Sequence, residues 1–98
     1  MGIFGNIFGG TSKNDLKEKI KAGALLIDVR TKEEFRSGHV EGAVNIPLDV
    51  LSGKASKLKK DVPIVTVCQS GMRSSTATSI LRNKGFEAYN GGCWNNFL

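Results

Sequence analysis

The chain has 98 residues, and its 14 Lys and Arg against 9 Asp and Glu give a formal net charge of +5 at pH 7. Hydrophobic residues make up 40% and charged residues 23% of the chain, which excludes collagen-like, disordered and coiled-coil classes and predicts one globular domain. No apolar run approaches the roughly twenty residues of a membrane span. The positive surplus favours anionic partners in general.

Residues 1–11 differ in composition from the rest, because large apolar side chains alternate with glycines. In a helix, four of these apolar side chains would share one face: Ile3, Phe4, Ile7 and Phe8. We expect residues 1–11 to form an arm that covers an apolar patch of a domain spanning 12–98. The alternative is an arm that docks on a membrane surface or a partner, although the basic face typical of membrane-surface helices is absent.

The first half of the chain alternates helical and strand patterns. A Ser-x-x-Asp capping box opens a helix over 12–23, and the apolar run 24–29 has the length of a buried strand. A Thr-x-x-Glu capping box then opens a short helix over 31–38. We expect an extended segment at 43–47 and a helix at 49–58.

The second half repeats this alternation. The β-branched run 63–67 predicts a second buried strand, followed by a turn at 68–73 and a helix at 74–84. A short strand is expected at 86–89 and a loop at 90–98. Such alternation predicts an α/β fold with a mostly parallel sheet and helices on both faces.

Cys68 stands where such a fold binds its ligands, directly after the second buried strand. Because a helix begins near Ser74, the thiol would lie among unpaired N–H groups at the positive end of a helix dipole, which favours the thiolate. Gly71 permits a tight turn, Ser70 adds a hydroxyl, and Arg73 adds a positive charge. The pattern predicts a cradle for a small anion with a nucleophile at its base. A buried structural cysteine is the alternative, but it requires neither the glycine turn nor the arginine.

The chain resembles the single-domain rhodaneses of the thiosulfate sulfurtransferase family. The resemblance is carried, in family order, by LIDVR at 26–30, EEFRSGHVEGAVNIP at 33–47, VCQSGMRS at 67–74 and YNGGCW at 89–94. It covers nearly everything from Ser12 onward. It implies a three-layer sandwich, with a central five-stranded parallel sheet and helices on both faces, and an active-site cysteine that carries sulfur as a persulfide.

The resemblance also implies roles for individual residues. Cys68 matches the persulfide-forming cysteine, and the residues expected to bind the transferred sulfur or the substrate are Gln69, Ser70, Gly71, Met72, Arg73 and Arg30. Three further residues are expected to support the site: Asp28, His39 and Ser74. For Asp28 the expected partners are the loop amides or the Arg73 side chain.

The short loop favours sulfur transfer over phosphate chemistry. Four residues separate Cys68 from Arg73, whereas related phosphatase and arsenate-reductase domains have one more and accommodate a tetrahedral oxyanion. We therefore expect a sulfurtransferase that takes sulfur from thiosulfate or a related donor and passes it to a thiol, cyanide or a protein thiol, without a cofactor. The alternative is a non-enzymatic persulfide carrier or a protein-docking sulfur-relay module.

The remaining groups give weaker indications. Cys93 is either a buried or rim thiol, or a second acceptor that resolves a Cys68 persulfide as a disulfide. A basic cluster lacks interleaved aromatic residues and predicts a solvated face, with no nucleic-acid site: Lys54, Lys57, Lys59 and Lys60. One histidine and two cysteines have no metal-ligand spacing, so no metal is expected. Two cysteines are too few for a secreted disulfide framework, and the first twelve residues contain no Lys or Arg, so we expect a cytoplasmic protein.

Overall fold

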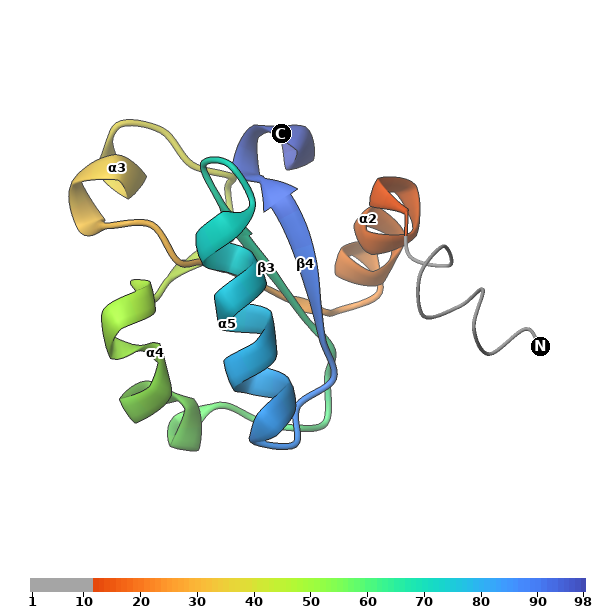
Figure 1. Cartoon of the computed structure of the whole chain (residues 1–98). Helices are drawn as coiled ribbons and strands as arrows, with labels where there is room; N and C mark the ends of the chain where they lie inside the picture. Colours follow the sequence, from red (N-terminus) through yellow and green to blue (C-terminus); the bar gives the residue numbers. More distant parts are fainter. Residues whose placement is uncertain (1–11) are drawn as a thin grey trace.

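The computed structural model describes residues 12–98, which form a parallel sheet between two helical layers (Figure 1). In chain order the elements are α2 (Lys13–Lys21), β1 (Leu25–Asp28), α3 (Lys32–Arg36), β2 (Val44–Asn45), α4 (Leu48–Lys54), β3 (Ile64–Cys68), α5 (Met72–Asn83) and β4 (Ala88–Cys93). Short 3-10 helices cover Ala55–Lys57 and Trp94–Phe97. The expected arm at residues 1–11 lies outside the described residues.

The sheet has four strands in the order β2-β1-β3-β4, and every neighbouring pair is parallel. These strands fall in or next to the four segments whose patterns predict strands. The family resemblance implied a five-stranded sheet. Within residues 12–98 the sheet has four strands, and the segments between them form helices, turns and loops. The three-layer α/β architecture is confirmed with four strands in the described part of the chain.

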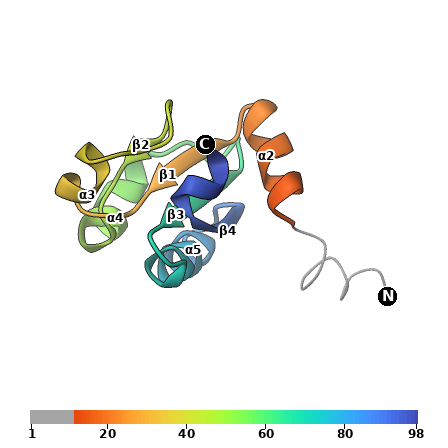
Figure 2. The same ribbon diagram turned by 90° about the horizontal axis from the view of Figure 1, so that it is seen from above.

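Two cores hold the layers together, one on each face of the sheet. The larger core lies between the sheet and the helices α4 and α5, which run side by side in Figure 1. The smaller core lies under α2 on the other side of the sheet (Figure 2). Strand β3 is buried along its whole length between the two, which explains its continuous apolar and β-branched sequence. No helix in the described part is long and apolar enough to cross a membrane.

Local sequence signals set most of the helix starts. Both predicted capping boxes are present: in one the Asp15 amide donates to Ser12 Oγ at 3.1 Å, and in the other the Glu34 amide donates to Thr31 Oγ1 at 3.2 Å. Helix α5 begins two residues earlier than expected, because Gly71 adopts φ +98° and turns the chain directly into the helix. The turn after β3 is therefore shorter than its sequence indicated.

The parallel topology gathers the sequence blocks at one edge of the sheet. The carboxyl ends of neighbouring parallel strands lie together, and Asp28 at the end of β1 is in register with Val67 on β3. On the other side of β3, Cys68 is in register with Cys93 at the end of β4. Chain segments far apart in the sequence therefore meet around Cys68.

Candidate active site

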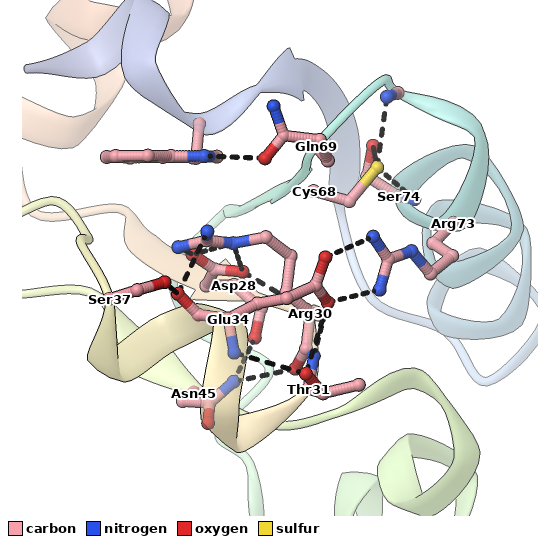
Figure 3. Close-up of polar contacts among 12 residues, drawn as sticks. Asp28, Arg30, Thr31, Glu34, Ser37, Asn45, Cys68, Gln69, Arg73 and Ser74 are labelled. Atoms are coloured by element: carbon pink, nitrogen blue, oxygen red, sulfur yellow. Dashed lines mark hydrogen bonds and ion pairs between the residues drawn. The ribbon is translucent and has the colours of Figure 1, made fainter.

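The sulfur of Cys68 lies at the end of β3, enclosed by the first turn of α5 (Figure 3). Its Sγ accepts hydrogen bonds from the N–H groups of Gly71, at 3.0 Å, and Ser74, at 3.3 Å. The thiol donates to the Ser74 hydroxyl oxygen at 3.4 Å. Cys68 is 0% exposed, so this sulfur is covered by protein and surrounded by donors.

These donors decide the charge of the thiol. Burial alone raises the pKa of Cys68, but hydrogen bonds from the Ser74 hydroxyl and from the amides of Ser74, Gly71 and Ser70 outweigh it and lower the pKa below its usual value. The positive end of the α5 dipole acts in the same direction. These donors therefore stabilise the thiolate relative to that of a free cysteine.

The loop residues after Cys68 are arranged around this enclosed sulfur. Gln69 accepts a hydrogen bond from the indole N–H of Trp94 at 3.2 Å, which connects the loop to the segment after β4. Gly71 lies beside β4, where an added Cβ would be 3.4 Å from the Cα of Gly92, an ordinary van der Waals contact. Met72 is 77% exposed at the start of α5 and stands beside the loop as an apolar surface residue.

Arg73 binds a carboxylate in this structure. Its Nη1 and Nη2 donate to Glu34 Oε1 at 2.7 Å and Oε2 at 3.0 Å, a two-point ion pair between α5 and α3 (Figure 3). The Arg73 bond is the main reason that the pKa of Glu34 falls from 4.5 to about 2, and the same bond raises the pKa of Arg73. The arginine contributes positive charge near Cys68, and Glu34 fixes its position.

The contacts of Asp28 follow the expectation in part, because Oδ1 accepts a bond from the Arg30 backbone N–H at 3.1 Å, whereas Arg73 does not bond to it. Arg30 Nε donates to Asp28 Oδ1 at 2.9 Å and Nη2 to Oδ2 at 2.8 Å, so the partner of Asp28 is Arg30 instead of Arg73. The Arg30 guanidinium also donates to the Gly38 carbonyl at 2.7 Å and lies over the Trp94 ring at 4.4 Å. Its side chain is 3% exposed, so the geometry favours a supporting role over the expected substrate contact. Arg30 lies two residues beyond the end of β1, and its side chain folds back onto the Asp28 carboxylate.

His39 lies beside α3. Its Nδ1 is 2.7 Å from the Phe35 carbonyl, and its ring stacks on the Phe35 ring at 3.7 Å between centroids. These contacts fix the course of the chain after α3. They give His39 a structural place, with no bond to Cys68.

The second cysteine lies next to the first in the sheet. Cys93 is half-buried, and its thiol donates to Asn95 Oδ1 at 3.0 Å. Both cysteines are free thiols, and the strand register sets Cys93 opposite Cys68. That Cys93 resolves a Cys68 persulfide stays a prediction, which peptide mapping of the oxidised protein for a linkage between the two would test.

Three residues of the site carry contacts that sequence reasoning did not assign. The sequence shows Glu34 as a helix cap, and Asn90 and Trp94 as members of the YNGGCW block, but it assigns these two residues no contacts. Asn90 lies on β4 and bonds to both Gly71 and Ser74. The missing signal is tertiary, because each residue acts on a segment at least sixteen positions away in the chain.

Comparison with known proteins agrees with this geometry. A family model described as a rhodanese-like domain matches residues 12–95. The chain belongs to the rhodanese-like domain family.

Within residues 12–98 no group of three or more His, Cys, Asp or Glu side chains is placed to hold a metal ion.

Curated relatives of this rhodanese-like chain include several longer proteins. YqhL of Bacillus subtilis is 42% identical over 78 residues, covering 76% of this chain and 62% of YqhL. Thiosulfate sulfurtransferase 16 of Arabidopsis thaliana is 39% identical over 77 residues, covering 66% of this chain and 64% of that protein. YrkF of B. subtilis, named as a candidate sulfur carrier, is 34% identical over 73 residues, covering 72% of this chain and 40% of YrkF. The chain spans less than two thirds of each.

Solved structures share the fold over most of their length. The rhodanese-like domain protein of Staphylococcus aureus superposes with a TM-score of 0.75 at 28% identity, covering 88% of this chain and 87% of that one. The human single-domain sulfurtransferase TSTD1 gives a TM-score of 0.71 at 29% identity, covering 86% of this chain and 89% of that one. The rhodanese fold is therefore shown, together with relatives named for sulfur transfer and sulfur carriage.

Proposed function

We propose that this rhodanese-like domain is a sulfurtransferase in which Cys68 carries sulfur between a sulfane donor, such as thiosulfate, and a thiol, cyanide or protein-thiol acceptor. The observation that carries the proposal is the pair of backbone N–H groups that donate to the Cys68 sulfur, at 3.0 and 3.3 Å, with the Ser74 hydroxyl oxygen 3.4 Å away. Such preorganised donors stabilise an anionic sulfur where water is excluded.

The reaction consists of two displacements at sulfur. The Cys68 thiolate attacks the outer sulfur of thiosulfate, a new S–S bond forms, the old S–S bond breaks, and sulfite leaves with the electron pair. The persulfide keeps one negative charge, which the amides of the loop stabilise. An acceptor thiolate or cyanide then attacks the terminal sulfur, and Cys68 leaves as the thiolate. Neither step requires a cofactor or an outside oxidant.

The loop that covers the sulfur must also admit the donor. Because Cys68 is 0% exposed, a donor reaches Sγ only when the loop over Gln69–Gly71 moves. Gln69 and Ser70 are exposed, so this movement disturbs little of the core. We expect the terminal sulfur of the persulfide to lie among the amides of this loop, beneath the charge of Arg73.

A sulfur-carrier module is the second candidate. In this case the loop over the covered sulfur would open when a partner protein docks, and YrkF, one of the relatives, is named as a candidate sulfur carrier. The chemistry at Cys68 is the same in both. They differ in whether free thiosulfate loads the cysteine at a useful rate.

Turnover with thiosulfate and cyanide separates these possibilities. We expect thiocyanate formation by the parent chain, loss to the uncatalysed background in Cys68→Ser, and near-parent rates in Cys93→Ser, which is the matched control at the other cysteine. Equal turnover by Cys68→Ser and the parent would overturn the proposal. If a protein persulfide loads the parent chain while thiosulfate does not, the domain is the carrier.

A further inference from the structure

The side chain of Asn90 joins the two residues that donate to the Cys68 sulfur. Its Nδ2 donates to the Gly71 carbonyl at 3.1 Å, and its Oδ1 accepts from the Ser74 hydroxyl at 2.6 Å. The backbone N–H groups of Gly71 and Ser74 are the ones that bond to Cys68 Sγ. One amide on β4 therefore contacts both donor residues from outside, without touching the sulfur.

The orientation of this amide is fixed by its partners. The Gly92 N–H also donates to Asn90 Oδ1, at 2.9 Å, so the oxygen faces two donors and the nitrogen faces a carbonyl. Rotating the amide by half a turn would set its NH₂ group against the Gly92 N–H and its oxygen against the Gly71 carbonyl. Only one orientation satisfies all three contacts.

The Ser74 hydroxyl has a single hydrogen and two neighbours that can accept it. At 2.6 Å it donates to Asn90 Oδ1, so the neutral Cys68 thiol donates to the Ser74 oxygen at 3.4 Å. When the sulfur is an anion, the Ser74 hydroxyl hydrogen lies between two acceptors, Asn90 Oδ1 at 2.6 Å and Cys68 Sγ at 3.4 Å, while the Gly71 and Ser74 N–H groups donate to the sulfur. Asn90 therefore holds the Ser74 hydroxyl in place in either charge state.

We propose that Asn90 is a positioning residue, which holds Gly71 and Ser74 where their N–H groups donate to the anionic sulfur of Cys68. The proposal deepens the sulfur-transfer function and rests on it for the persulfide stage. At the thiolate stage it stands on the hydrogen bonds alone. Asn90 acts on the sulfur only through these two residues.

The charged groups near the site are paired with one another, so a substitution of the neutral Asn90 leaves their charges unchanged. On α5, Arg73 is bound to Glu34 of α3, and after β1, Arg30 is bound to Asp28. Strand β4 presents the neutral Asn90 to the same loop. A change in the Cys68 thiolate on substitution of Asn90 therefore reports on the donors, provided that both ion pairs stay in place.

The test is a pH titration of the Cys68 thiolate, followed by its ultraviolet absorbance in the full chain carrying Cys93→Ser and without any sulfur donor. Asn90→Ala removes the anchor of Gly71 and Ser74, so we expect the titration to move to higher pH. The thiolate fraction below the inflection should fall by about tenfold, the effect of one partly lost hydrogen bond to a charge. Asn95→Ala is the matched control, because Asn95 contacts Cys93 and not the donors of Cys68.

A titration of Asn90→Ala that coincides with Asn95→Ala, or that moves to lower pH, overturns the proposal. If Asn90→Ala does not fold, Asn90→Ser replaces it. Asn90→Ser adds no charge and its side chain is too short to bond to both Gly71 and Ser74, so we expect a shift to higher pH; an unchanged titration again overturns the proposal. Because no sulfur is transferred, this result is independent of whether Cys68 forms a persulfide.

Discussion

At the scale of single residues, the site has two kinds of residue: Gly71 and Ser74 bond to the Cys68 sulfur, and Asn90 bonds to Gly71 and Ser74. The Cys68 sulfur accepts hydrogen bonds from the neutral backbone N–H groups of Gly71 and Ser74. The sequence predicts the nucleophile and its loop, because a cysteine between a buried strand and a glycine turn is a local pattern. It does not predict that Arg73 binds Glu34, since that contact spans 39 positions and depends on where α3 lies.

The Arg73–Glu34 pair makes a prediction about stability and pH. The folded-state pKa of Glu34, about 2, is below its usual 4.5, so the pair stabilises the fold above about pH 4.5 and this contribution disappears as the pH falls toward 2. Both side chains are more than a third exposed, which limits the contribution to roughly 0.5–1 kcal/mol. Glu34→Gln keeps a capping side chain and should lower the free energy of unfolding by this amount near neutral pH, and by progressively less as the pH falls through about 2, in urea titrations.

Glu33→Gln on the same helix is the control, because Glu33 forms no ion pair among residues 12–98. If the stability difference between Glu34→Gln and the parent were the same at both pH values, the pair would not stabilise the fold through its charge.

At the scale of elements, local patterns predict which segments form helices and strands, and tertiary packing sets their ends. Strand β4 begins two residues later than expected and runs through Asn90 to Cys93, which the sequence placed in a loop. Two consecutive glycines argue against a strand locally, yet the ladder with β3 continues through them with a bulge. This bulge brings Gly92 against Gly71, a contact that no local signal shows.

Gly91 is the tightest point of this bulge. An added Cβ would lie 2.9 Å from the Thr66 carbonyl oxygen and 2.9 Å from Val67 Cγ1, both in the buried strand β3. We expect Gly91→Ala to lower the free energy of unfolding by about 1–3 kcal/mol, because the core must shift to admit the methyl group. Urea unfolding measures this change.

Gly53→Ala in α4 is the matched control for this substitution. An added Cβ at Gly53 meets no atom within 4 Å, and alanine is the better helix former, so we expect stabilisation by about 0.5–1 kcal/mol. Equal stability of Gly91→Ala and the parent would show that β4 does not pack on β3 as described.

At the scale of the whole molecule, charge and topology act together on the site. The alternation of strand and helix patterns in the sequence predicts the parallel sheet with helices on both faces. The parallel strands bring Asp28, Cys68 and Cys93 to one edge of that sheet. The sequence pattern indicates four strands, and the fifth was implied by the family resemblance alone. No segment within residues 12–98 forms it. The chain as a whole carries a net charge of +5, and the site is proposed to receive small anions.

This charge predicts that anionic reagents reach Cys68 faster than neutral ones of the same size. Iodoacetate and iodoacetamide form a matched pair, because they differ mainly in charge. In the Cys93→Ser chain we compare the alkylation rate with iodoacetate to that with iodoacetamide. We expect the ratio of the first rate to the second to fall by up to about tenfold between low salt and about 1 M salt, where the Debye length is near 3 Å. A ratio independent of salt would show that the positive surplus does not act at the site.

The most direct test of the central claim is the mass of the Cys68 peptide after the chain has been incubated with thiosulfate or a protein persulfide and the excess removed. We predict that this peptide gains the mass of one sulfur atom, that cyanide or a thiol removes it, and that Cys68→Ser gains nothing. Sulfur found on Cys93 alone, or on neither cysteine with either donor, would contradict the account.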